Sequence, residues 1–131
     1  MALMLKLINQ HFETIELRRN ITTEQTLELE NRYDFYVKYS DDFKHCLATL
    51  ICEVRSKDNP EVFYIKLVNV GEFECAGIES DDTKKEAHIE CNKILFPYSQ
   101  YMVSNLSVRA GLPPVFIENQ FYTKDLISVN K

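Results

Sequence analysis

The chain has no tryptophan, only three glycines and four prolines among 131 residues, and no apolar run near the ~20 residues of a membrane span. This composition excludes collagen-like and low-complexity sequence, and 45% hydrophobic residues exclude a disordered chain. A net charge of −5 argues against a nucleic-acid partner, which would favour a basic face. The apolar start lacks the charged segment of a signal peptide. We therefore expect one cytoplasmic domain over residues 1–131, without membrane insertion.

Residues that carry chemistry are scattered along the chain. The histidines His11, His45 and His88 stand singly, and no H-E-x-x-H, C-x-x-C or glycine-rich phosphate loop is present. His88 and Cys91 could share a helix face as half of a metal site, but no second ligand pair accompanies them. The sequence predicts no enzyme, no cofactor and no metal. It also predicts four reduced, buried thiols: Cys46, Cys52, Cys75 and Cys91.

Four stretches predict β-strands. Residues 27–39 alternate between apolar and charged side chains, which is the pattern of a half-buried strand. Strands over about 43–55 and 62–75 follow after short polar turns, so the three form an antiparallel meander. The N-terminal stretch is also strand-like, with a change of phase that predicts a bulge near residues 9–11. Apolar residues on both faces of this sheet favour a subunit interface.

The second half predicts helices. Thr83–Glu86 has the spacing of a capping box after Asp81–Asp82, and a short helix is expected over about 83–90. A second helix is expected to begin at Pro97 and end at Gly111. Its apolar stripe packs in the core or meets another subunit and consists of Tyr98, Tyr101, Met102 and Leu106. The aromatic loop after Pro114 belongs either to the core or to a binding surface, and a last helical turn or two is expected from Thr123.

Three motifs between residues 62 and 121 resemble the SecB family of bacterial protein-export chaperones. They are G-E-F-E-C-A-G-I at 71–78, N-K-I-L-F-P-Y at 92–98 and R-A-G-L-P-P at 109–114, followed by N-Q-F at 119–121. Residues 1–61 agree with the family only in strand order and patterning. The resemblance implies an α+β fold: a four-stranded antiparallel sheet, a broken long helix, a crossover loop and a short C-terminal helix.

The same resemblance implies a function without catalysis or nucleotide. SecB-like subunits form homo-tetramers, as dimers of dimers, and hold unfolded polypeptides in apolar grooves beside the crossover loop. The implied oligomer interface is the stripe of the second helix. The implied peptide-binding residues are Leu27, Leu29, Leu112, Val115, Phe116, Ile117, Phe121 and Tyr122.

The chain departs from the family where acidic residues dock the translocation motor SecA. Lys66 stands in the third strand of the meander, and Thr14 and Arg18 stand in the first strand of the chain, at the corresponding positions. The motif F-P-Y is followed by Ser99-Gln100 in place of the family's usual Ala-Arg. We therefore expect peptide holding with weak SecA binding.

Three functions compete at this point. The first is an ATP-independent holdase for export preproteins, and a close variant is a SecB-like chaperone that protects the antitoxin of a toxin–antitoxin system. The second is an oligomeric assembly protein of the same fold that binds no clients. The third, a small α+β enzyme, is disfavoured because no catalytic motif is present.

Overall fold

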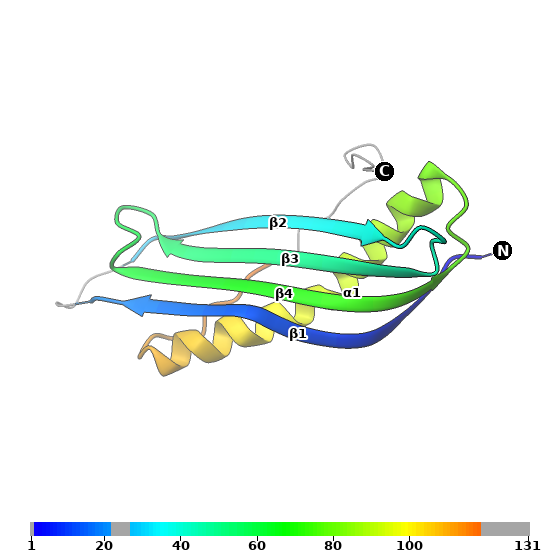
Figure 1. Ribbon diagram of the computed structural model, residues 1–131. Helices are drawn as coiled ribbons and strands as arrows, with labels where there is room; N and C mark the ends of the chain where they lie inside the picture. The colour runs from blue at the N-terminus through cyan, green and yellow to red at the C-terminus, as the bar shows by residue number, and fades with distance from the viewer. Residues whose placement is uncertain (1, 22–26, 119–131) are drawn as a thin grey trace.

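The computed structural model describes residues 2–21 and 27–118 and has one sheet with one long helix (Figure 1). The sheet is antiparallel, with strand order β1-β4-β3-β2. Its strands are β1 (Met4–Arg19), β2 (Leu29–Tyr39), β3 (His45–Ser56) and β4 (Phe63–Ala76), and the helix is α1 (Asp81–Arg109). The predicted α+β fold and four-stranded sheet are confirmed. The short C-terminal helix expected from Thr123 lies outside the described residues.

Strand β1 contains the irregularity that its change of phase predicts. Its pairing with β4 shifts between Leu7 and Asn9 and again between Phe12 and Thr14. Each shift leaves one extra residue, so the apolar side chains change parity and then change back. The two shifts enclose the predicted position, and together they keep Leu5, Phe12 and Leu17 on the helix side of the sheet.

The helix is continuous, and the prediction of two helices separated before Pro97 is wrong. Pro97 lies inside a 29-residue helix. Proline removes one backbone hydrogen bond, here the bond to the carbonyl of Lys93, and both residues lie on the exposed side of α1. Buried residues on both sides of Pro97, such as Cys91 and Val103, keep the two halves on the sheet. This burial outweighs the roughly 3 kcal/mol that an interior proline costs.

Both ends of α1 are capped. Ser80 is the N-cap residue, and the backbone N–H of Thr83 donates to its Oγ at 3.2 Å. The backbone N–H of Ser80 donates in return to Thr83 Oγ1 at 2.9 Å, so the capping box begins three residues earlier than predicted. Gly111, at φ +81°, ends the helix as predicted, because glycine adopts this left-handed conformation without strain.

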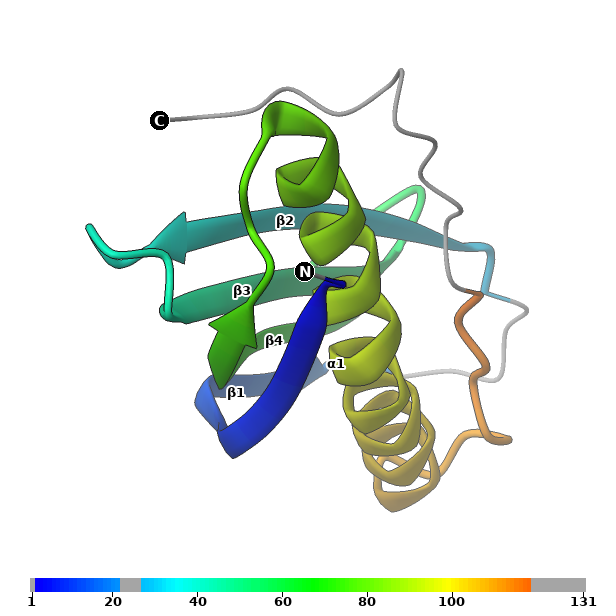
Figure 2. The same cartoon turned by 90° about the vertical axis from the view of Figure 1, so that its right-hand side faces the viewer.

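Helix α1 crosses the sheet diagonally (Figures 1 and 2). At its start, Tyr39 Oη near the end of β2 donates to the carbonyl of Lys84 at 3.2 Å. At its end, Arg19 Nε of β1 donates to the carbonyl of Ala110 at 2.6 Å. Two opposite corners of the sheet are therefore not covered by α1: the corner at the start of β2 and the corner at the start of β1.

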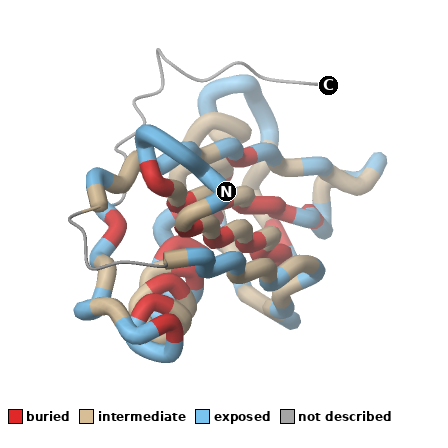
Figure 3. The backbone as a smooth tube through the Cα atoms, turned by 90° about the vertical axis from the view of Figure 1, so that its left-hand side faces the viewer, coloured by how far each residue is buried: buried red, intermediate tan, exposed pale blue. Residues whose placement is uncertain are grey.

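The core lies between the sheet and α1, where buried residues concentrate (Figure 3). The buried Asn69 of β4 ties three elements together: Gln10 donates to its Oδ1 at 2.7 Å, and its Nδ2 donates to the carbonyl of Leu95 at 2.9 Å. The polar groups of Asn69 are thus paired inside an apolar core. The largest fully buried side chains are those of Phe63, Phe73, Leu50, Ile65, Leu67 and Leu95.

Candidate polypeptide-binding site

The segment after α1, residues 112–118, turns back along the helix toward the start of β2 (Figure 2). Two side chains of α1 hold its backbone. Ser104 Oγ donates to the carbonyl of Val115 at 2.9 Å, and Gln100 Nε2 donates to the carbonyl of Ile117 at 2.9 Å. The sequence analysis did not predict these roles of Gln100 and Ser104, although their spacing of four residues places both on one side of a helix. The segment is therefore part of the folded unit.

The structure divides the predicted peptide-binding residues into three groups. Leu27, Leu29, Leu112 and Val115 are half-buried and pack against the core, and Ile117 is inside it at 2% exposure. Phe116 points the other way and is 79% exposed. Phe121 and Tyr122 lie outside the described residues. In this arrangement Phe116 is the member of the described segment that offers a large apolar surface to a partner.

The predicted helix stripe is also divided. Tyr98 and Tyr101 are 41% and 69% exposed, whereas Met102 and Leu106 are half-buried against the core. The stripe therefore leaves two tyrosines exposed and packs Met102 and Leu106 against the core. The helix face against the sheet is built by other residues, spaced about one turn apart: Cys91, Leu95, Ser99, Val103 and Ser107.

The sheet face opposite α1 brings Thr14, Arg18 and Lys66 together, and it surrounds Lys66 with acids. Cross-strand pairing places Lys66 between Glu16 of β1 and Glu53 of β3, and Glu53 is opposite Arg32 of β2. The four strands thus carry one row of alternating charge, 16–66–53–32. We call these four residues the charge row.

A neighbouring row of the same face continues this pattern of compensation. Arg18 lies over the ring of Tyr64, with its guanidinium carbon 4.6 Å from the ring centre. Arg55 Nε donates to Glu30 at 2.6 Å, and this hydrogen bond lowers the pKa of the Glu30 carboxyl. The basic side chains at this end of the face are therefore locally paired and form no free basic patch.

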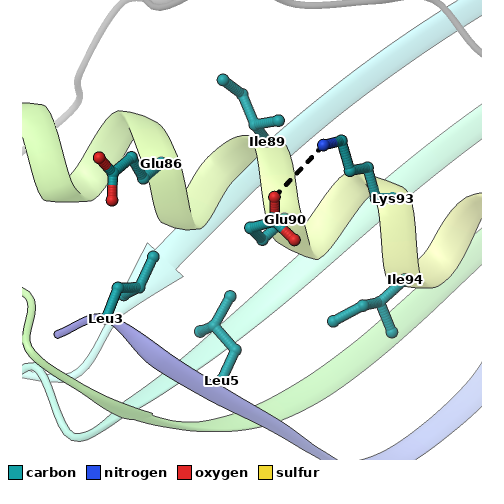
Figure 4. A pocket seen from close by; sticks show the side chains of 7 residues that line it. All are labelled: Leu3, Leu5, Glu86, Ile89, Glu90, Lys93 and Ile94. Carbon is teal, nitrogen blue, oxygen red and sulfur yellow. Dashed lines mark hydrogen bonds and ion pairs between the residues drawn. The ribbon is translucent and has the colours of Figure 1, made fainter.

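A hollow of about 600 Å³ lies at the second uncovered corner, between α1 and the start of β1 (Figure 4). Leu3, Leu5 and Ile94 form its apolar side, and Glu86, Glu90, Lys93 and Ile89 complete its lining. The charged rim is partly self-paired, because Lys93 Nζ lies 3.4 Å from Glu90 Oε1. The sequence reasoning did not anticipate this hollow, because it arises from the angle at which α1 crosses the sheet.

The four cysteines are buried free thiols, and their predicted burial is confirmed. Three of them converge, which the sequence did not show: Cys46 Sγ lies 3.3 Å from Cys75 Sγ and 4.0 Å from Cys91 Sγ. Burial and the contact with Cys46 raise the pKa of the Cys75 thiol to about 12, and burial raises that of Cys52 to about 12. Among the described residues, no group of three or more His, Cys, Asp or Glu side chains is arranged to hold a metal ion.

Comparison with known proteins identifies the family. Residues 9–126 match the family model of the preprotein translocase subunit SecB. The chain belongs to the SecB family. This is a chaperone family, and the resemblance of the sequence motifs is confirmed. Within the part of the chain that the structure describes, no helix is long and apolar enough to cross a membrane.

SecB relatives match over part of their length. The protein-export protein SecB of Ruegeria sp. (strain TM1040) is 33% identical over 91 residues, which are 69% of this chain and 49% of that protein. SecB of Caulobacter vibrioides (strain NA1000 / CB15N) is 34% identical over 62 residues, 47% of this chain and 38% of that protein. The matched stretches thus span less than half of each of these two relatives.

A solved structure shares the fold at low sequence identity. The Mycobacterium tuberculosis SecB-like chaperone Rv1957, in complex with a ChAD peptide from the HigA1 antitoxin, has a TM-score of 0.72 and 13% identity to this chain. The similarity covers 91% of this chain and 92% of that protein, so the SecB-like fold extends over nearly the whole chain.

Proposed function

We propose that this chain is an ATP-independent holdase that binds unfolded or extended polypeptides and keeps them from aggregating. The observation that carries the proposal is Phe116, a large apolar side chain that is exposed on a segment fixed to the folded unit. A phenylalanine that is 79% exposed leaves apolar surface that an unfolded polypeptide can cover, and burial of that surface favours binding. Membership of a chaperone family supports the same conclusion.

The test is suppression of aggregation of a chemically unfolded polypeptide by the purified chain, without ATP. We expect the double variant Phe116→Ser, Phe121→Ser to hold the polypeptide at least ~10-fold less tightly, since a buried aromatic anchor contributes on the order of 1–3 kcal/mol. Val108→Ser is the matched control, because it removes an exposed apolar side chain of α1 near the same end. Equal holding by the double variant and the control would show that the segment does not bind clients.

The clients are export preproteins in the leading proposal and an antitoxin in the second. Curated relatives are named protein-export proteins, whereas the structural relative carries an antitoxin peptide. A toxin–antitoxin operon beside the gene would support the second proposal. An unfolded preprotein held in preference to a neighbouring antitoxin would support the first.

For assembly, we propose a homo-tetramer built as a dimer of dimers. The exposed Tyr98 and Tyr101 on α1 and the exposed Met4, Ile8 and Ile15 on edge strand β1 are surface that a second subunit would cover. Light scattering of the natural chain tests this, and a clean monomer of 15.4 kDa at micromolar concentration would refute it. A tetramer that leaves unfolded polypeptides to aggregate would favour the alternative of an assembly protein without clients.

For SecA, we propose weak binding. Thr14, Arg18 and Lys66 share the sheet face opposite α1, and none supplies the acid that the family uses there. Tight binding of SecA to the natural chain, measured by calorimetry, would restore the ordinary export role.

A further inference from the structure

The contact between α1 and residues 112–118 has the geometry of backbone recognition. Gln100 and Ser104 are four residues apart, which is about 6 Å along a helix. The carbonyls that they bind, of Ile117 and Val115, are two residues apart, which is about 6.6 Å along an extended chain. Donors one helical turn apart therefore fit alternate carbonyls of an extended segment. These two hydrogen bonds do not depend on which side chains the segment carries.

The side chains of the segment alternate in the same register. Val115 is half-buried, Phe116 is exposed, Ile117 is buried and Glu118 is exposed. Ile117 enters the core, and the segment runs toward the start of β2, where the diagonal helix leaves the sheet uncovered (Figure 2). This corner thus accepts an extended stretch with apolar side chains at every second position. Here that stretch is the chain's own.

We propose that residues 113–118 occupy the client seat as an internal stand-in, and that a bound client segment displaces Val115 and Ile117 from it, while the exposed Phe116, which lies outside the seat, contacts the client from the displaced segment. This inference rests on the proposed holdase function and specifies the client: an extended stretch with aliphatic side chains at alternate positions. Gln100 and Ser104 then bind two carbonyls of the client as they bind those of the segment. Recognition through the backbone explains how one seat accepts many sequences.

The joint before the segment allows this exchange while α1 stays in place. Arg19 Nε binds the carbonyl of Ala110, and the backbone N–H of Leu112 donates to the carbonyl of Ser107 at 3.0 Å, so the helix end is fixed up to Gly111. Pro113 and Pro114 are exposed and have no N–H to leave unpaired when the segment moves. The attachment that must break consists of two side-chain hydrogen bonds and the packing of Val115 and Ile117 against the core.

Ile117→Ser tests the proposal, because it weakens the stand-in and leaves Gln100 and Ser104 intact. Loss of a buried isoleucine lowers the equilibrium constant for docking of residues 113–118 by roughly tenfold or more. Client affinity is measured by fluorescence anisotropy with a labelled unfolded polypeptide. It should rise by about the same factor, provided that the chain's own segment occupies the seat most of the time in the natural protein. Val108→Ser, which removes an exposed side chain, should leave this affinity unchanged. Equal or weaker client binding by Ile117→Ser would overturn the proposal.

A labelled peptide of residues 112–118 gives a second readout, with its Val115→Ser, Ile117→Ser version as control. The Ile117→Ser chain should bind the natural peptide, and the client should displace that peptide in a competition experiment. The same chain should not bind the control peptide. Adding Gln100→Ala and Ser104→Ala should cancel the gain. If Ile117→Ser does not fold, Val115→Ser takes its place, because Val115 is only half-buried.

The two proposals fail separately. If both the natural and the Ile117→Ser chain let the polypeptide aggregate, the holdase proposal is wrong. Peptide binding then still tests the stand-in proposal. Binding of the natural peptide to the Ile117→Ser chain supports that proposal, and no binding overturns it.

Discussion

Replacing Lys66 by glutamate tests the charge row. Lys66 lies directly opposite Glu16 on one side and Glu53 on the other. The variant Lys66→Glu turns two attractive cross-strand pairs into two repulsive ones and leaves three carboxylates side by side. The same substitution supplies an acid on the proposed SecA-docking face, so its effect on stability must be known before its effect on SecA is interpreted.

The magnitude follows from the two pairs. An opposite-charge pair in register contributes roughly 0.2–1 kcal/mol, and a like-charge pair costs a similar amount. The side chain of Glu16 is 44% exposed, so values in the middle of this range are appropriate. Lys66→Gln, which only removes the two attractions, should cost about 1 kcal/mol, and Lys66→Glu about 2 kcal/mol.

The free energies of unfolding of both variants are measured in urea at low salt and at about 1 M NaCl. The difference between the two variants should shrink at high salt, because salt screens partly exposed charges. Adding Glu16→Lys to Lys66→Glu should recover part of the loss. If Lys66→Glu and Lys66→Gln unfold at the same urea concentration at low salt, the charge row does not exist in solution. Where Lys66→Glu folds, SecA affinity should rise relative to the natural chain and to Lys66→Gln.

Three further predictions concern other parts of the molecule. Gly111→Ala should lower the free energy of unfolding by about 1 kcal/mol because of its φ of +81°, and Gly111→Asn by less, since asparagine tolerates this region. Burial lowers the pKa of His88, so the stability that its neutral form contributes above about pH 6.5 should be lost as pH falls. The urea midpoints at about pH 7 and pH 5 should therefore differ less for His88→Gln than for the natural chain. Metal analysis of untagged protein should find no stoichiometric zinc, because the raised pKa values of Cys46 and Cys75 keep protonated the thiols that would have to ionise to bind it.

The sheet was predictable because its signal is local. Period-two alternation placed β2, β3 and β4 to within about two residues, and the phase slip placed the irregular part of β1. The break before Pro97 was wrong because local sequence cannot weigh one lost hydrogen bond against burial on the sheet. The capping box was misplaced because Thr83 is its third helical residue rather than its cap.

The site was less predictable, since its parts meet only in three dimensions. Composition identified the apolar loop 112–122, but not which side chains of its described part, 112–118, point inward. The roles of Gln100 and Ser104 depend on where the chain goes after Gly111. The convergence of three cysteines likewise depends on how α1 lies across β3 and β4. The hollow beside Leu5 follows from the diagonal path of α1.

The alternation within the charge row also bears on the speed of encounter. The row carries two negative and two positive charges, so its own field cancels within a few ångströms beyond the sheet, and only the net charge of −5 on the chain acts at longer range. The row itself therefore does not draw a partner in from a distance. By itself it should leave the association rate near the unsteered range of about 10⁵–10⁶ M⁻¹s⁻¹ and add little dependence on ionic strength. Selectivity on this face then comes from how long a partner stays, not from how fast it arrives.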